Sequence, residues 1–343
     1  MSGFKKHVNI PVFIPHLGCP NNCVFCNQRS ISGKKEFVAE SVIPEIEEAL
    51  STVRQEQEAE IAFFGGSFTG IDRELMISLL GIGQKYIDGG RVSGMRLSTR
   101  PDYISPEIIE ILLRYGVKTV ELGIQSMDDK VLEASKRGHT KEQTERACKL
   151  VKDAGFSLVG QMMVGLPGAD VESEKMTALK ICEMGADGAR VYPTVVFYET
   201  ELCEMSKMGM YEPLNEIDAV ERTKEVLKVF DSHGVPCIRV GLCASENLSS
   251  AEAVYGGANH SAIGEMAIGE IFYEKMDKLI STLSLDEIEK RNRKLIFKVA
   301  KGNTSKAVGQ KRKNIIRLCE KYSLLGIKIV EKSEIIGYNI IIE

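Results

Sequence analysis

The sequence predicts an α/β protein, with a partial or full parallel β/α barrel of the TIM type followed by a small basic α+β module. Two observations predict the barrel. Short apolar runs alternate with longer amphipathic segments along most of the 343 residues, as expected for repeated βα units. Several of the amphipathic segments end in a glycine directly before the next apolar run, at Gly116, Gly155 and Gly234. Glycine in that position terminates helices.

Each unit of the predicted barrel can be placed on the chain. The strand candidates are residues 8–14, 60–66, 94–99, 117–124, 156–164, 188–196 and 235–242. The main helical segments between them are residues 41–57, 72–87, 105–116, 140–155 and 218–234. Parallel strands joined by right-handed crossovers leave the helices on the outside. We therefore expect the chemistry at the carboxyl ends of the strands, as in other β/α barrels.

The pattern changes near residue 275, which divides the chain into a predicted core domain, residues 1–275, and a C-terminal module, residues 276–343. The module is predicted as a strand (294–301), a helix (305–323) and two closing strands (327–333 and 338–343). Residues 290–321 contain twelve Lys and Arg against one acid, Glu320, whereas the whole chain has a net charge of −4. Such asymmetry indicates a surface for a polyanion; the alternative is an ordinary solvated charged face.

Composition places the chain among ordinary globular proteins. It is 43% hydrophobic and 27% charged, and no apolar run reaches the ~18 residues of a membrane span. The N-terminus lacks the apolar stretch of a signal peptide. Nine cysteines, an odd number and mostly scattered, do not indicate a disulfide framework. These features predict a cytoplasmic protein without membrane contact.

Three cysteines near the start of the chain are the strongest chemical signal. Cys19, Cys23 and Cys26 lie in CPNNCVFC, a C-x₃-C-x₂-C run in a loop rich in Gly, Pro and Asn. A 4Fe–4S cluster usually takes four cysteine ligands, so three thiolates would leave one iron open to another ligand. The alternative is a structural zinc site in which His16 is the fourth ligand.

Polar residues follow or end consecutive predicted strands. Gly65, Gly66 and Ser67 follow the second strand, where two glycines would let backbone amides approach a charged ligand. The third, fourth and fifth strands end in further polar side chains, namely Ser98 with Arg100, Gln125, and Gln161. One such residue is commonly a satisfied core group, but a succession of them favours a ligand site at the mouth of the barrel.

With these residues in place, the chain resembles the radical S-adenosylmethionine (SAM) superfamily. CPNNCVFC has the form of the cysteine signature, including Phe25 before the last cysteine, and FFGGS that of the SAM-binding glycine motif. Within the superfamily the Elongator catalytic-subunit branch is most similar, with the oxygen-independent coproporphyrinogen oxidases as a related branch. The blocks that carry this resemblance span roughly residues 10–265 and are, in order, FFGGSFTGI, LSTRPDYI, ELGIQSMDDKVLEASKRGHT, GQMMVGLPG and RVYPTVV.

The resemblance implies a 4Fe–4S cluster on Cys19, Cys23 and Cys26, with SAM on the open iron. It implies that Gly65, Gly66 and Ser67 meet the SAM amino group. The family positions that hold the ribose and carboxylate of SAM are matched by Ser98, Gln125, Arg137 and Gln161. Arg137 suits a carboxylate chemically, because it is a fixed, forked cation. The implied reaction is reductive cleavage of SAM to a 5′-deoxyadenosyl radical that abstracts hydrogen from a substrate.

The sequence also departs from the Elongator pattern. That branch spaces its cysteines more widely and continues into an acetyltransferase domain, which we expect this chain to lack. The C-terminal module contains AVGQKRKNI, which resembles a degenerate KH-type RNA-binding loop. RNA, and tRNA in particular, is therefore an expected partner, together with an electron donor such as flavodoxin or ferredoxin. The basic residues around the loop are Lys306, Lys311, Arg312, Lys313 and Arg317. An iron–sulfur or haem-handling carrier remains the non-catalytic alternative.

Overall fold

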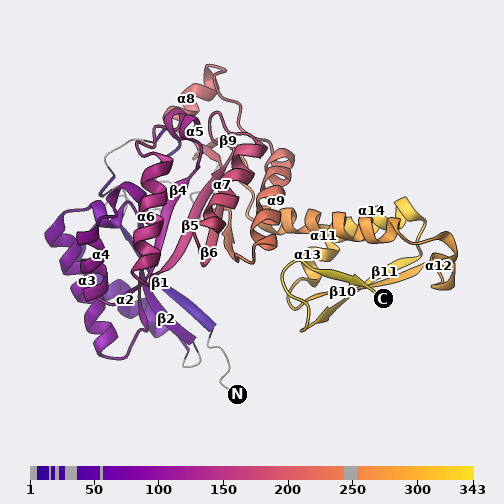
Figure 1. Cartoon of the computed structure of the whole chain (residues 1–343), viewed down its shortest axis with the longest axis horizontal. Coiled ribbons are helices and arrows are strands. Elements are labelled where there is room, and N and C mark those ends of the chain that lie inside the picture. Colours follow the sequence, from indigo (N-terminus) through magenta and orange to yellow (C-terminus); the bar gives the residue numbers. More distant parts are fainter. Residues whose placement is uncertain (1–5, 15–16, 20–22, 28–36, 55–56, 243–252) are drawn as a thin grey trace.

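The computed structural model describes residues 6–14, 17–19, 23–27, 37–54, 57–242 and 253–343. Its main element is a seven-stranded, all-parallel sheet of order β1-β2-β3-β4-β5-β6-β8. The strands are β1 (Lys6–Ile14), β2 (Gln57–Gly65), β3 (Gly94–Thr99), β4 (Val117–Gln125), β5 (Ser157–Val164), β6 (Gly188–Pro193) and β8 (Cys237–Val240). The sheet curls into a half-barrel (Figure 1). The predicted parallel β/α fold is therefore confirmed, in its partial form.

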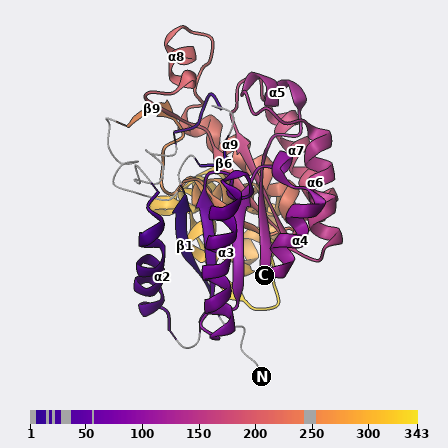
Figure 2. The ribbon, with the colours of Figure 1, turned by 90° about the vertical axis from the view of Figure 1, so that its left-hand side faces the viewer.

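Helices cover the outer face of this sheet (Figures 1 and 2). They are α2 (Val42–Ser51), α3 (Arg73–Asp88), α4 (Pro106–Arg114), α6 (Lys141–Asp153), α7 (Val171–Glu183) and α9 (Glu216–Ser232). Strand residues such as Phe63, Leu97 and Val120 are buried in the core beneath them. Because strand side chains alternate between the two faces, the intervening polar residues point to the concave inner face.

One predicted strand is two elements, which corrects the expected strand at 188–196. β6 ends at Pro193, and β7 (Val195–Phe197) pairs instead with β9 (Val254–Gly257) in a separate antiparallel sheet. The turn between them is held by Thr194, whose N–H and Oγ1 both donate to the carbonyl of Val164 at 2.8 Å. Short helices α5 (Asp129–Ala134) and α8 (Glu201–Lys207) lie at this same end of the sheet (Figure 1).

The C-terminal part consists of helices packed on one three-stranded sheet. The helices are α11 (Ile263–Ser281), α12 (Leu285–Lys290), α13 (Thr304–Val308) and α14 (Lys313–Tyr322). The strands β10 (Lys294–Ala300), β11 (Gly326–Lys332) and β12 (Ile340–Ile342) form a sheet of order β11-β10-β12. The predicted boundary between residues 275 and 276 falls inside α11, so the division into residues 1–275 and 276–343 stays a prediction.

The helix expected over residues 305–323 is wrong as a single element. Gly309, Lys311 and Arg312 have φ values of 76°, 50° and 64°. These left-handed conformations end α13 and begin α14 as a separate helix, because a right-handed helix cannot continue through them.

Among the described residues, no helix combines the length and the apolar character that a membrane span requires.

Candidate cofactor site

Backbone hydrogen bonds attach the middle of the cysteine loop to two neighbouring segments. A turn joins Cys23 to Cys26, with the Cys26 N–H donating to the Cys23 carbonyl at 3.0 Å. Between them, the Val24 N–H donates to the carbonyl of Ser135 at 3.2 Å, and the Val24 carbonyl accepts from the N–H of Leu202 at 2.8 Å. Segments that follow α5 and open α8 therefore hold the loop from both sides.

Phe25 and Cys19 have different surroundings. The ring of Phe25 is half-buried against a small apolar cluster of Val24, Val196, Leu202 and Cys203. Burial raises the pKa of the Cys19 thiol, while the nearby guanidinium groups of Arg137 and Arg100 act to lower it. The two arginines thus favour the thiolate that metal binding requires.

The FFGGS segment packs against the end of β1 and the start of the cysteine loop. The Gly66 N–H donates to the Ile14 carbonyl at 2.8 Å, and the Ser67 N–H donates to the Leu17 carbonyl at 3.1 Å. A Cβ on Gly66 would lie 2.1 Å from the Leu17 oxygen, and one on Gly18 would lie 2.2 Å from the Ser67 oxygen. Glycine is required at both positions, because two backbones meet there in direct contact.

The Ser67 side chain is directed into the protein. It is 1% exposed, and its Oγ accepts from the Arg100 N–H at 3.1 Å and bonds to Thr99 Oγ1 at 2.9 Å. Thr99 Oγ1 bonds in turn to Thr69 Oγ1 at 2.6 Å. This buried hydroxyl network fixes the end of β2 against the end of β3, and sequence reasoning did not find its two threonines.

Arg137 lies directly against the cysteines. Its Nη1 donates to Cys23 Sγ at 3.3 Å, and its Nη2 donates to the Gly123 carbonyl at 2.8 Å. The Arg137 backbone carbonyl accepts from Arg100 Nη2 at 2.5 Å, and Arg100 is itself paired with Asp102 at 2.9 Å. A second arginine therefore fixes the position of the first.

Gln125 stands beside Arg137 with its amide oxygen unsatisfied. It ends β4 with a φ of 65°, and its buried Oε1 has no hydrogen-bond partner among the described residues. A Cβ on Gly123 would lie 3.1 Å from Gln125 Nε2 and 3.3 Å from Arg137 Nη2. The glycine thus leaves room for both side chains, and a buried acceptor without a partner is available to a bound ligand.

Ser98 and Gln161 meet on the inner face of the sheet. Gln161 Nε2 lies 3.2 Å from Ser98 Oγ and donates to Glu121 Oε2 at 2.9 Å. Gln161 lies three residues before the end of β5, rather than at its end as predicted. The structure therefore gathers Ser98 and Gln161 in one group, and Gln125 and Arg137 in another.

Glu121 links a buried charge network that sequence reasoning missed. Its fully buried carboxylate pairs with Arg96 at 3.1 Å and with Arg190 at 2.8 Å. Arg96 also pairs with Glu60 at 2.9 Å. A charged residue in the middle of an apolar strand, as in VELGI, was the available signal, since a buried charge persists only where it is paired.

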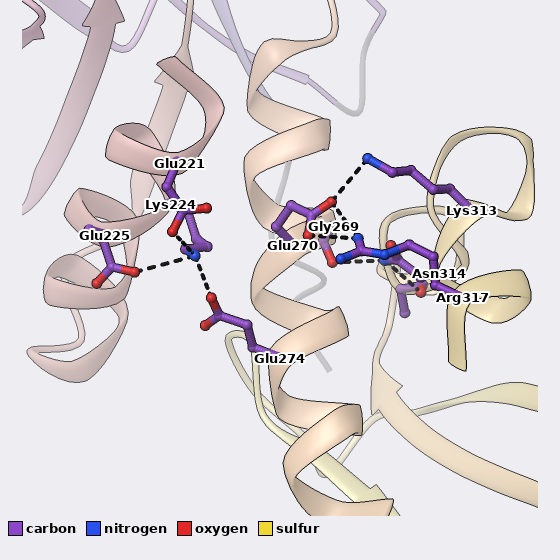
Figure 3. Close-up of polar contacts among 10 residues, drawn as sticks. Glu221, Lys224, Glu225, Gly269, Glu270, Glu274, Lys313, Asn314 and Arg317 are labelled. Carbon is purple, nitrogen blue, oxygen red and sulfur yellow. Dashed lines mark hydrogen bonds and ion pairs between the residues drawn. The ribbon is translucent and has the colours of Figure 1, made fainter. Parts of the chain in front are cut away.

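A cluster of acidic side chains lies in another part of the described chain, between α9 and α11. The one group of His, Cys, Asp or Glu ligand atoms found within 4.8 Å of one another there is Glu221, Glu225 and Glu274. Lys224 forms ion pairs with all three carboxylates (Figure 3), so an ammonium group already occupies the centre of this cluster and compensates part of its charge. His16, the fourth ligand of the zinc alternative, lies outside the described residues.

Comparison with known proteins connects this site to one family. Residues 13–179 match the model of the radical SAM superfamily, and residues 186–272 match that of the radical SAM C-terminal domain. An uncharacterized protein of Methanocaldococcus jannaschii is 30% identical over 226 residues, which are 62% of this chain and 69% of the relative.

Two kinds of characterised relatives match over a shorter region. The tRNA uridine(34) acetyltransferase of Methanocaldococcus jannaschii is 40% identical over 134 residues, and human Elongator complex protein 3 is 34% identical over 137 residues. These regions are 38% and 39% of this chain, but only 25% of either relative. The solved structure of archaeal Elp3 from Methanocaldococcus infernus has a similar fold, with a TM-score of 0.61 at 23% identity, over 80% of this chain and 63% of that one.

Proposed function

Because the chain belongs to the radical SAM superfamily, with a 4Fe–4S cluster and SAM as its cofactors, we propose that it is a radical enzyme acting on RNA, tRNA in particular. The observation that carries the catalytic part is the convergence of Arg137 on Cys23 beside the unsatisfied amide oxygen of Gln125. The guanidinium group of Arg137 next to Cys23, together with the free amide oxygen of Gln125, suits a zwitterionic ligand bound beside a cluster.

The residues present fit both cofactors. Cys19, Cys23 and Cys26 would hold the cluster, with Phe25 beside the last ligand. When bound, the reduced cluster supplies the electron that cleaves SAM to methionine and the 5′-deoxyadenosyl radical, which takes a hydrogen atom from the substrate. The protein's own part is to bind, orient and shield these groups.

The chemistry of each polar group indicates which part of SAM it would contact. Arg137 would hold the SAM carboxylate through charge-assisted hydrogen bonds. The turn formed by Gly65, Gly66 and Ser67 would meet the amino group. An ammonium ion needs acceptors, and the N–H groups of Gly66 and Ser67 already donate to the carbonyls of Ile14, at the end of β1, and of Leu17. The carbonyl oxygens of this turn are therefore the contacts that we propose.

The ribose is assigned to the remaining groups. Gln125 Oε1 is an acceptor for a ribose hydroxyl, and Ser98 with Gln161 would provide a second contact from the inner face. Glu121 acts through Gln161, because its carboxylate accepts the Gln161 amide hydrogen at 2.9 Å and thereby sets which way that amide points. Glu121 is in this proposal a positioning residue.

The RNA substrate rests on two supports. The basic excess of residues 290–321 suits a polyanion, and two groups of relatives carry names of tRNA-modifying or Elongator proteins. The chain spans about a quarter of those relatives' length, so their acetyl transfer is not assigned to it. We further propose a cytoplasmic location and flavodoxin or ferredoxin as the electron donor.

The catalytic proposal is tested by anaerobic reconstitution. We expect a reduced 4Fe–4S electron paramagnetic resonance signal that changes shape when SAM is added, and release of 5′-deoxyadenosine. Arg137→Gln should keep its iron but need about ten- to a hundredfold more SAM for half-maximal cleavage, the range for loss of a hydrogen bond between charged groups. Arg146→Gln, on the exposed side of α6, is the matched control and should behave as the unaltered protein.

Stoichiometric zinc without iron would overturn the proposal in favour of a structural metal site. A cluster whose signal is indifferent to SAM would favour a carrier. If Arg137→Gln and Arg146→Gln had the same SAM dependence, the assignment of Arg137 to the carboxylate would be wrong even though the enzyme is active.

A further inference from the structure

The basic residues of α14 are largely neutralised by α11. Arg317 Nη1 lies 2.9 Å from both carboxylate oxygens of Glu270, and its guanidinium lies 3.6 Å from the ring centre of Tyr273. Lys313 lies 3.4 Å from the same carboxylate (Figure 3). These two members of the predicted RNA-binding cluster therefore attach α14 to α11. A carboxylate this close opposes the approach of phosphate.

Lys321, one turn further along α14, is also paired. Its Nζ lies 2.7 and 2.9 Å from the two oxygens of Asp277 on α11. Three successive turns of α14 thus direct their cations towards acids of a neighbouring helix. Of the five basic residues that the sequence suggested for RNA, Lys313 and Arg317 are thus paired with an acid of α11, whereas Lys311 and Arg312 are exposed.

The three-stranded sheet presents a different surface. Leu295, Phe297 and Val299 of β10 are buried, on the face that packs against the helices. Side chains alternate across a strand, so Lys294 and Lys298 of β10 point to the opposite face. In Figure 1 the helices α11 and α14 lie on one side of β10 and β11, and no described element covers the other side.

The neighbouring strand repeats this pattern. β10 and β11 are parallel, with Ile296 opposite Lys328 and Lys298 opposite Val330. Lys328 therefore lies on the open face, and Lys332, four residues further along β11, lies on it too. The lysines of the two strands alternate with apolar neighbours, which spreads the four charges over the face.

Acidic residues are directed away from this face or lie at its edge. Glu331 of β11 belongs to the opposite side, and its carboxylate accepts from Thr304 Oγ1 at 2.9 Å. Glu343, after β12, is 3.5 Å from Lys298. No ion pair joins Lys294, Lys328 or Lys332 to another residue that the structure describes. The face is therefore a positive surface with its charges largely uncompensated.

We propose that this open sheet face, the lysine face (Lys294, Lys298, Lys328 and Lys332), binds the phosphate backbone of the RNA substrate. The inference rests on the proposed function and names the surface that serves it. Lysines four residues apart on a strand are separated by about 13 Å, which suits an extended polyanion better than a small anion. β10 and β11 carry no aromatic side chain on this face, so we expect contacts to phosphate and not to stacked bases.

The location of the lysine face favours RNA over an acidic electron donor. The cysteine loop follows β1, whereas the C-terminal sheet is reached through α11, beyond α9 and the opposite edge strand β8 (Figure 1). A donor docked on the lysine face would be far from the cysteines. A long nucleic acid can contact this face and still reach the inner face of the half-barrel.

The test is a triple substitution measured on the full-length, cluster-loaded enzyme. Lys294→Gln, Lys328→Gln and Lys332→Gln together should weaken the binding of bulk tRNA about tenfold or more at low salt. They should also reduce the slope of log K against log salt by about 2 to 3, since each lost phosphate contact lowers that slope by roughly one. Cleavage of SAM without RNA should not change.

A matched control removes the same charge elsewhere. Lys85→Gln, Lys118→Gln and Lys149→Gln affect three exposed lysines of the half-barrel and should leave tRNA affinity and the salt slope nearly unchanged. Circular dichroism of both variants verifies folding. A second probe, polyglutamate at matched charge concentration, should compete poorly with tRNA.

The possible failures are distinguishable. If the unaltered enzyme binds no tRNA even at low salt, the RNA part of the proposed function is wrong. If it binds tRNA but the lysine-face and control variants bind equally well, the lysine face is wrong while the proposed function stands. If polyglutamate displaces bound tRNA as effectively as competing RNA does, the face is a general anion surface and the RNA assignment fails.

Discussion

His139 is a histidine buried next to the proposed cofactor residues. Its side chain is only 4% exposed, and it lies close to the backbone of Ile124 and the guanidinium group of Arg137. Burial lowers the pKa of His139 to about 3, assisted by the positive charges of Arg137 and Arg100. The folded protein therefore favours the neutral imidazole.

This shift predicts a loss of stability in acid. In the unfolded chain the imidazole titrates near 6.5, so the unfolded state binds a proton between pH 6.5 and 3 that the folded state does not. The contribution of His139 is thus present above pH 6.5 and declines as the pH falls. Urea unfolding should show a loss of about 2 kcal/mol from this group between pH 7 and pH 5.

Two histidine variants isolate the contribution of His139 to the pH dependence of the unfolding free energy. His139→Gln should have a shallower dependence of unfolding free energy on pH than the unaltered protein, whereas His233→Gln, at an exposed position, should keep the original slope. Equal slopes in all three proteins would show that folding does not lower the pKa of His139.

At the scale of elements, one buried carboxylate joins a loop and two helices. Glu174, on α7 and 3% exposed, accepts from the Gly165 N–H after β5 at 2.6 Å and pairs with Arg222 of α9 at 2.5 and 2.9 Å. Burial raises the pKa of Glu174, and Arg222 opposes that rise. The arrangement holds α7, α9 and the end of β5 together.

Removing Arg222 should therefore lower the free energy of unfolding. Arg222→Leu leaves the Glu174 carboxylate buried without its counter-charge, which costs about 3–5 kcal/mol of unfolding free energy. Chemical denaturation measures this directly. Adding Glu174→Gln to the Arg222→Leu protein should recover part of the loss.

An exposed ion pair on the same helix is the control. Lys175 and Glu172 are 3.0 Å apart on the surface of α7, and Lys175→Ala should cost at most about 1 kcal/mol. If Arg222→Leu were no more destabilising than Lys175→Ala, the buried pair would not hold these elements together.

At the scale of the whole molecule, α11 connects the half-barrel to the C-terminal sheet. It packs against α9 on one side and against α13, α14 and β12 on the other. Phe272, in the middle of α11, is fully buried and meets the ring of Tyr338 edge-on at 6.1 Å. A helix shared by two packed layers couples their folding.

We therefore expect calorimetry of the full chain to show one cooperative unfolding transition. Phe272→Ala should destabilise that single transition by about 3–5 kcal/mol, the cost of removing a large buried ring. Ile217→Ala, at a residue that is 80% exposed, should change it by no more than about 0.5 kcal/mol. Two separated transitions, of which Phe272→Ala shifted only one, would contradict this coupling.

Much of the fold could be predicted because it follows from local patterns. The parallel strands and the outer helices depend on apolar periodicity and on glycines that end helices, such as Gly116 and Gly155. The break of the 305–323 helix was harder to predict. The segment is strongly amphipathic, but Lys311 and Arg312 adopt left-handed backbone conformations that residue type alone does not indicate.

The candidate site divides in a similar way. The cysteine run and the paired glycines were recognisable because their spacing along the chain carries the chemistry, whereas Arg137 was assigned through the resemblance to the radical SAM family. Glu121 was missed because its importance comes from Arg96 and Arg190, which lie on other strands. Sequence neighbours do not show which charges become spatial partners.

By itself, then, the sequence determined the parallel β/α architecture, the three thiols and the positive charge of the C-terminal part, because these depend on residue type and on spacing along one chain. Only the tertiary structure decided which of those charges remain available. It pairs Lys313, Arg317 and Lys321 with acids of α11 and leaves the lysine face open, because ion pairing depends on distances between elements that are far apart in sequence.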